Sequence, residues 1–311
     1  MAEPLAPGAQ RGPSGVATDS RKPGLEAPKI LVDLAQRKTA MVAAILLVLV
    51  VLVSLLAPWI APHDPGTIGK MDITNRLKPP FFVPGGSITY PLGTDAMGND
   101  ILSRLMYAGR VSLLVAIAAV LVGGIAGVVV GLVAGYIGKW VDDIFMRIVD
   151  IQLSMPPLIL AIFLMAVVGR GITNVILVLA LFSWVGLTRV VRAQVLSLRE
   201  RDFIEAARIS GTSSDDIMFR HILPITMAPV IVISSFAVAA AILTESSLSF
   251  IGLGVDVTTP TWGNMLADGR MYITTAWWIV MFPGLMITIT VLSINLLGDW
   301  LRDYLDPRLK L

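Results

Sequence analysis

The sequence contains no cysteine and only two histidines, His63 and His221, among its 311 residues. Disulfide bridges and thiolate metal sites are therefore excluded, and two histidines so far apart along the chain give no zinc-binding pattern. Charged residues are also scarce, since they make up 15% of the chain, whereas average usage is about 25%. Such a deficit is hard to reconcile with a surface covered by water, and it indicates that lipid surrounds most of the chain.

A strong excess of one charge is missing as well. The 24 basic and 22 acidic residues leave a net charge of +2, so there is no broad basic field for nucleic-acid binding. Residues 1–28 have no apolar core near their start, so we expect no secretory signal peptide there. This stretch is rich in Pro, Gly, Ala and Ser and lacks apolar periodicity, which predicts a disordered cytoplasmic tail.

Long apolar runs are what the sequence has in abundance. Hydrophobic residues make up 55% of the chain, and its mean hydropathy is +0.79. The runs free of charged residues are 41–57, 112–137, 151–168, 172–188, 225–244 and 274–297. Because about 20 helical residues cross a bilayer, each run is predicted to be one transmembrane helix. If both chain ends are cytoplasmic, most of the Lys and Arg residues outside the runs fall in cytoplasmic segments. Because cytoplasmic loops of membrane proteins carry an excess of Lys and Arg, this distribution predicts that both ends are cytoplasmic.

Ionisable residues are absent from the interiors of these runs. Ion-coupled transporters place such groups inside the membrane, so their absence argues against a carrier driven by an ion gradient. The nearest one is Glu245, which is either an interfacial carboxylate at the end of the fifth helix or a group that lines an outer gate. The chain also lacks a Gly-x4-Gly-Lys-Ser/Thr phosphate loop, so it is not expected to bind ATP by that route.

Two features of the runs predict how the helices pack and bend. Glycines recur every fourth residue in the second run, which predicts a smooth helix face against which another backbone packs closely; they are Gly123, Gly127, Gly131 and Gly135. Pro156 and Pro157 lie early in the third run and are expected to kink or delay that helix.

The longest late loop, within residues 199–224, has strong local helix signals. Residues 203–209 suit a short helix, and Gly211 is a natural stop for it. Ser213 and Ser214 can cap a second helix with acidic residues in its first turn, and Pro224 is expected to end that helix before the fifth span. The prediction is a pair of short helices joined at a glycine bend, on the cytoplasmic face.

This loop resembles the EAA loop of ABC importer permeases through its Glu-Ala-Ala triplet, the glycine that follows it and a terminal Leu-Pro. In that family the loop is a coupling helix that docks into a cleft of the ATPase subunit. His221, before Ile222-Leu223-Pro224, matches the variant of dipeptide and oligopeptide permeases, where we interpret it as a packing residue. The resemblance implies these ATPase-coupling residues: Glu205, Ala206, Ala207, Gly211, Asp215, Arg220, Leu223 and Pro224.

A second stretch, residues 92–113, resembles the outer-loop signature of the second permease in dipeptide, oligopeptide, nickel and glutathione importers. Asn99 departs from the arginine that is usual there, and Ala108-Gly109 replaces the common Gly-Ala. Asp95 is predicted to cap a short helix at the membrane surface. Residues 245–254 also match the ending of the family's fifth helix. We expect the translocation path or outer gate to involve Arg110, Glu245, Ser246 and Ser249.

The predicted fold is an all-α membrane protein: six transmembrane helices with the type I ABC importer permease fold and cytoplasmic termini. The expected divisions are a tail (1–28), an amphipathic segment with the first span and outer loop (29–111), a five-helix core with the coupling loop (112–298) and a C-terminal tail (299–311). No catalytic residue, metal site or cofactor is expected in this chain.

The resemblance implies the partners and the location. They are a related second permease in a heterodimer, two ATP-binding subunits that hold ATP and Mg²⁺, an extracytoplasmic substrate-binding protein, and the lipid of a bacterial inner membrane. Peptides are the expected cargo, with nickel or glutathione as alternatives. A stand-alone ion-coupled carrier is the competing hypothesis from another class.

Overall fold

The structure is a computed structural model that describes residues 27–63 and 73–305. Within these ranges it is helical, and the only β-pairing is an isolated bridge between Thr94 and Asp100. The predicted disordered tail lies outside the described residues except for Ala27 and Pro28, which begin a helix instead. The main helices are α1 (Ala27–Gln36), α2 (Lys38–Leu55), α3 (Ala57–Ile60), α4 (Ile101–Ile137), α5 (Lys139–Leu153), α6 (Pro157–Val168), α7 (Ile172–Leu198), α8 (Asp202–Ile209), α9 (Ser214–Asp216), α10 (Leu223–Phe250), α11 (Trp262–Gly269) and α12 (Trp278–Leu305). Three shorter turns are the 3₁₀ helices η2 (Ile73–Asn75) and η4 (Arg270–Tyr272) and the π-helix η3 (Ile217–Ile222).

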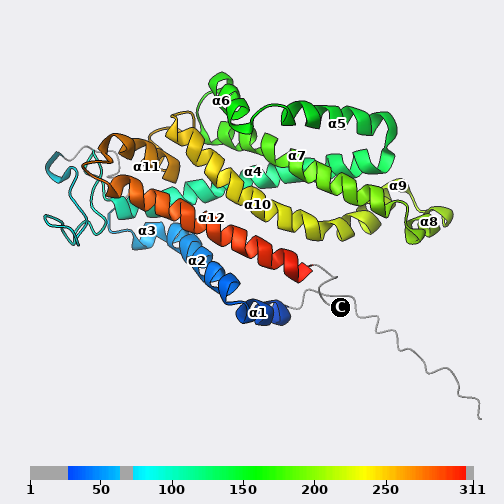
Figure 1. Cartoon of the computed structure of the whole chain (residues 1–311), viewed down its shortest axis with the longest axis horizontal. Helices are drawn as coiled ribbons and strands as arrows, with labels where there is room; N and C mark the ends of the chain where they lie inside the picture. Colours follow the sequence, from blue (N-terminus) through cyan, green and yellow to red (C-terminus); the bar gives the residue numbers. More distant parts are fainter. Residues whose placement is uncertain (1–26, 64–72, 306–311) are drawn as a thin grey trace, which may run out of the picture.

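Five unbroken helices in the described part of the chain are long and apolar enough to cross a membrane: α2, α4, α7, the continuous Ser214–Phe250 helix and α12. They correspond to the first, second, fourth, fifth and sixth apolar runs. Figure 1 shows the long helices running along the molecule, with α11 near one end and α8 at the opposite end. Several helices extend beyond their apolar runs, because polar residues that lie outside the hydrocarbon can still continue a helix.

The third predicted span is not one helix. Its first residues complete α5, and a break before Pro157 separates α5 from α6 with a bend of 93°. Pro156 and Pro157 lack the amide hydrogens that would continue the helix, so the kink expected from sequence becomes a complete break. Since α6 has 12 residues and rises about 1.5 Å per residue, it alone is too short to cross a bilayer. The described part of the chain therefore has six candidate spans only if the bent pair counts as one.

Helices α4 and α7 pack closely against each other, and glycine makes this possible. A Cβ atom added to Gly123 would lie 2.3 Å from the Ala180 carbonyl oxygen, and one added to Gly127 would lie 2.5 Å from that of Trp184. Gly131 and Gly135 meet the next two turns of α7 in the same way. The predicted glycine face is thus confirmed as a helix-packing surface, where backbones approach too closely for any side chain.

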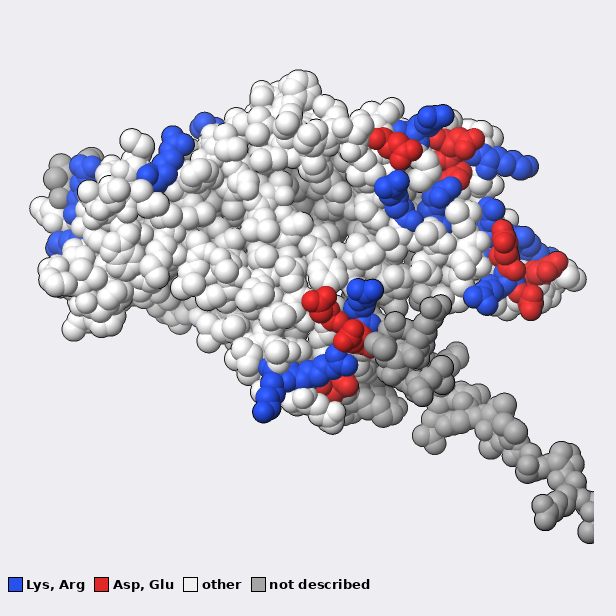
Figure 2. All heavy atoms as spheres, in the orientation of Figure 1, with Lys and Arg blue, Asp and Glu red and all other residues white. Residues whose placement is uncertain are grey.

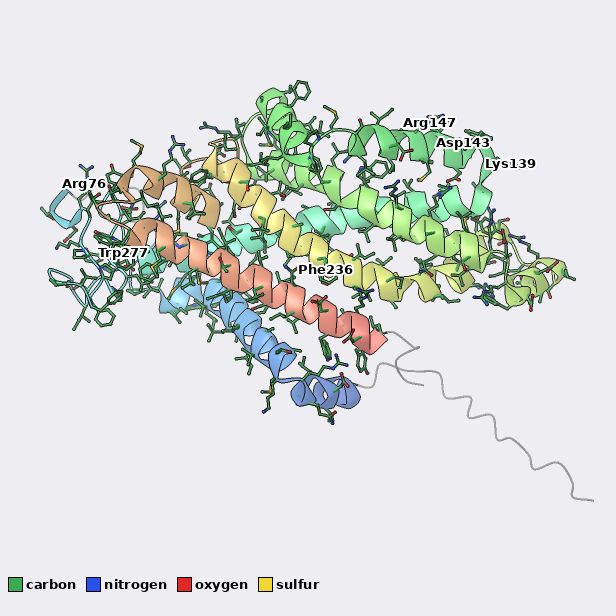
Figure 3. The ribbon with its side chains drawn as sticks, viewed as in Figure 1. Arg76, Lys139, Asp143, Arg147, Phe236 and Trp277 are labelled. Carbon is green, nitrogen blue, oxygen red and sulfur yellow. The ribbon has the colours of Figure 1, made fainter. Side chains whose placement is uncertain are left out.

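Helix α5 is held beside α7 chiefly by long polar side chains. The guanidinium of Arg192 pairs with Asp142, and Arg189 lies 3.5 Å from Asp150. Near the bend, the Trp184 indole donates to the Gln152 side-chain oxygen at 3.0 Å. Lys139, Asp143 and Arg147 also belong to α5, at the edge of the molecule in the view of Figure 3. Helix α5 thus lies at the periphery of the bundle.

Candidate functional site

Helix α8 projects from one end of the bundle between α7 and the helix that contains α10 (Figure 1). It is anchored by Ile204, which is fully buried in a small apolar cluster with Val195 of α7 and Ile222 of η3. The opposite side of α8 is open: Glu205 and Ala206 are exposed, and the Ile209 side chain is 82% exposed. The helix therefore presents small and apolar groups outward from a fixed base.

Gly211 ends α8 in a defined hydrogen-bonded motif. Its φ of +79° belongs to the left-handed region that glycine adopts without strain. Its amide donates to the Arg208 carbonyl at 3.0 Å, and the Thr212 amide donates to the Ala207 carbonyl at 3.1 Å, which together make a Schellman motif. A Cβ atom at this position would meet nothing within 4 Å, so backbone conformation rather than space within this chain requires glycine.

The second half of the loop agrees with the sequence at its start and differs at its end. The Ser213 hydroxyl accepts the Asp216 amide at 3.2 Å, so Asp215 and Asp216 do lie in the first turn of a capped helix. Arg220 then pairs with Asp216 at 3.1 Å. Pro224, however, does not end this helix, which continues through η3 into α10. The wider π turns immediately before the proline accommodate its ring without a break.

All eight sequence-predicted coupling residues therefore lie on or beside this projection. Six of them are exposed, whereas Ala207 and Leu223 are half-buried against the bundle. In the view of Figure 2, charges of both signs gather over this end and over α5. The arrangement is an exposed helix that is anchored at its base and surrounded by charged side chains, and it is suited to docking into another protein surface.

At the other end of the molecule, a buried charge network fastens the loop before α4. Arg104 is buried and pairs with Asp95, and it also reaches Asp268 of α11 at 3.0 Å. Asp95 accepts the Met97 and Asn99 amides at 2.8 and 2.9 Å and the Asn99 side-chain amide at 2.9 Å. The prediction that Asp95 caps a helix is wrong, because its carboxylate closes this loop.

Asp100, not Asp95, caps the helix that follows. Its side chain accepts the Ser103 amide at 2.9 Å at the start of α4. The same end carries exposed aromatic and basic groups, such as Trp277 and Arg76 (Figure 3). In the view of Figure 2 this end shows basic side chains and no acidic ones.

The three predicted path residues on α10 lie together but are buried within the chain. Glu245 is 0% exposed, and it accepts the Ser249 hydroxyl at 2.7 Å and the Ser246 hydroxyl at 3.4 Å. The Thr261 hydroxyl also hydrogen-bonds to this carboxyl group. Glu245 is thus buried rather than exposed at the end of its helix, and the two interpretations from the sequence, an interfacial carboxylate and a group at an outer gate, stay predictions. A role for these residues in the path stays a prediction.

Arg110 lies apart from that cluster, on a cavity of about 430 Å³ that we call the Arg110 cavity. It opens between α4, the start of α7 and the loop that follows α10. Its lining consists of Tyr107, Arg110, Val111, Leu114, Ile172, Thr258 and Pro260. The loop connects the cavity to the Glu245 cluster, since Thr261 directly follows Pro260.

Sequence reasoning missed the residues that hold this loop in place. The Asn264 side chain donates to the carbonyls of Asp256 and Thr259 at 3.1 and 2.9 Å. Thr261 caps α11 by accepting the Asn264 amide at 3.1 Å. The Thr-Trp-Gly-Asn stretch after a proline is a recognisable helix start, but nothing local reveals which carbonyls the asparagine reaches.

Residues 127–311 match the family described as the binding-protein-dependent transport system inner membrane component. The chain belongs to this family. Residues 30–80 of the permease also match the N-terminal transmembrane domain of oligopeptide transport permease C. The all-helical fold and its apolar spans are those of an inner-membrane permease component of an ABC importer, and the family resemblance read from the sequence is confirmed.

Curated relatives cover nearly the whole permease. A di/tripeptide transport system permease of Pseudomonas aeruginosa is 41% identical over 276 residues, which are 89% of this chain and 90% of the relative. A dipeptide transport system permease of Escherichia coli strain K12 is 44% identical over 275 residues, 88% and 91% of the two chains. A glutathione transport system permease of Escherichia coli is 41% identical over 271 residues, 87% of each chain.

Proposed function

We propose that this permease moves di- or oligopeptides across the membrane after an extracytoplasmic binding protein delivers them. Two relatives are named as permeases of a di/tripeptide and of a dipeptide transport system, and these names support a peptide cargo. The working unit in this proposal pairs the chain with a related second permease and with two ATP-binding subunits, which hold the ATP and Mg²⁺. The permease itself binds no nucleotide, and both of its termini are cytoplasmic.

The projecting helix α8 is the observation that carries this proposal. Ile204 fixes its base to the bundle, and the exposed Glu205 and Ala206 face outward. A rigid docking helix passes motion of a partner to the spans on either side of it, because α8 lies between α7 and the continuous helix through α10. ATP-driven closure of the partner subunits would thus move the spans as rigid bodies.

Gly211→Trp tests the coupling role. The substitution forces a bulky side chain onto left-handed backbone at the tip of the projection, where it would hold α8 out of a partner's cleft. We expect the variant to reach the membrane in normal amount but to lose peptide uptake, while ATP hydrolysis by the complex no longer responds to loaded binding protein. Uptake and hydrolysis are measured in the reconstituted transporter.

The matched control is Gly169→Trp. Gly169 also has a positive φ, +84°, and a Cβ there also meets nothing within 4 Å, but it lies between α6 and α7, away from α8. Both substitutions therefore add the same bulk and backbone strain. Normal, ATP-coupled uptake by Gly211→Trp would refute the coupling assignment.

Glutathione is a second candidate cargo, because the glutathione permease is as identical to this chain as the P. aeruginosa relative is. Purification of the tagged permease with its native partners from membranes separates the candidates. Labelled dipeptide and glutathione are then offered to the co-purified transporter, and the compound taken up with ATP identifies the cargo. Recovery of the chain alone, still able to move solute without ATP, would instead support a stand-alone carrier.

A further inference from the structure

The Arg110 cavity has the composition of a small-molecule site. Its volume of about 430 Å³ falls in the range of about 300–1,000 Å³ that is usual for ligand pockets. Leu114 and Ile172 provide apolar walls, while Tyr107 and Thr258 bring hydroxyl groups. Arg110 supplies the single formal charge among the lining residues.

The guanidinium of Arg110 has no partner among the described residues of the chain. No ion pair or hydrogen bond joins it to any of them, including Asp256 in the adjoining loop. Arg110 is exposed and comes just before the apolar run that starts at Ser112. A cation at the edge of the hydrocarbon is costly unless it meets water or an anion, and the planar guanidinium fork matches a carboxylate in a bidentate way.

The wall that the loop after α10 contributes to the cavity is fixed before any ligand arrives. Asn264 holds the carbonyls of Asp256 and Thr259, on either side of Thr258. Thr261, next to Pro260, is tied both to α11 and to the buried Glu245 carboxyl group. A ligand that enters the cavity therefore need not order this loop, which lowers the entropic cost of binding it.

We propose that the Arg110 cavity receives the carboxyl-terminal end of a peptide in transit, with the carboxylate on Arg110 and the last side chain against Leu114 and Ile172. This inference rests on the proposed peptide cargo. A free chain terminus is narrow enough to enter the cavity and brings the one anion that every unmodified peptide has. A folded protein surface would meet Arg110 only at the rim.

Photo-crosslinking in the complete reconstituted transporter tests this proposal. A photoreactive benzoylphenylalanine replaces Leu114 in the cavity or, as the control, Leu121, which is exposed further along α4 and does not line it. Tritiated alanyl-phenylalanine is supplied on the binding protein, the transporter is arrested with vanadate, and the sample is illuminated. We expect labelled dipeptide on the permease from position 114 and not from position 121.

Arg110→Gln combined with the probe at 114 should lower that labelling at least about tenfold, since a charge-assisted hydrogen bond contributes roughly that factor. Arg270→Gln, a change of another exposed arginine, should leave it unchanged. A crosslink from position 114 to the binding protein, the second permease or lipid, or labelling that is insensitive to Arg110→Gln, would overturn the proposal.

Uptake by the unmodified transporter distinguishes this inference from the proposed function. If the unmodified transporter takes up the dipeptide with ATP but position 114 captures none of it, only the cavity assignment fails. If the unmodified transporter takes up no dipeptide, the peptide cargo itself is wrong, and the cavity assignment falls with it.

Discussion

The contact between α4 and α7 allows a sharp stability prediction at Gly127. The Cβ of an alanine there would lie 2.5 Å from the Trp184 carbonyl oxygen, 3.1 Å from the Trp184 Cα and 3.0 Å from the Leu187 Cβ. Ordinary contacts begin near 3.4 Å, so the two helices must separate or slide. The nearest atom is a backbone oxygen, and the Leu187 Cβ is bonded directly to its backbone, so neither can rotate away. Overpacking of this kind costs about 1–3 kcal/mol.

Gly186→Ala is the matched control, because a Cβ at Gly186 of α7 meets nothing within 4 Å. Both substitutions add the same methyl group within a helix, and both gain about 1 kcal/mol of helix propensity over glycine. The difference between them therefore isolates the clash. Since 1 kcal/mol shifts the unfolding midpoint of a large domain by about 2–4 °C, Gly127→Ala should unfold several degrees below Gly186→Ala.

The assay is thermal unfolding of the detergent-solubilised protein, followed by size-exclusion chromatography of a fluorescent fusion. Thiol-reactive dyes would report nothing, because the chain has no cysteine. Equal midpoints for the two alanine variants would refute the reasoning, since they would mean that the helices are not packed backbone to backbone at Gly127.

Two further predictions use the same assay. Arg104→Met leaves the buried Asp95 carboxylate without its cation, and a broken buried ion pair lowers the free energy of unfolding by about 3–5 kcal/mol. The control Arg270→Met changes an exposed arginine and should leave the unfolding midpoint nearly unchanged. Similar midpoints for the two variants would contradict the buried charge network. Glu245→Leu removes the acceptor of the buried Ser249 hydroxyl and should lower the free energy of unfolding by about 1–3 kcal/mol. Glu245→Gln keeps an acceptor oxygen and should therefore unfold at a higher temperature than Glu245→Leu. A glutamine variant as unstable as the leucine variant would show that the cluster needs the charge rather than the hydrogen bonds.

The helices and the projecting loop were predictable because their signals are local. Apolar runs locate five unbroken spans, since a membrane helix must satisfy its backbone internally and cover itself with apolar groups. Gly211 marks the end of one helix because glycine adopts the left-handed backbone conformation there, and Ser213 marks the start of the next because its hydroxyl caps that helix. The glycine spacing of α4 likewise predicts a packing face, although not that α7 is the partner.

Local sequence signals were thus enough to predict five of the membrane helices, the two capped turns of the loop at 199–224 and the family. The remaining features depend on groups that meet from distant parts of the chain, so they are visible only in the folded structure. Arg104 pairs with Asp268, which lies 164 positions further along the chain. Glu245 is buried because α11 packs over it. The cavity beside Arg110 forms only where α4 meets the loop after α10. No window of sequence contains both sides of such a contact, and burial, pairing and cavity shape follow only from the contact itself.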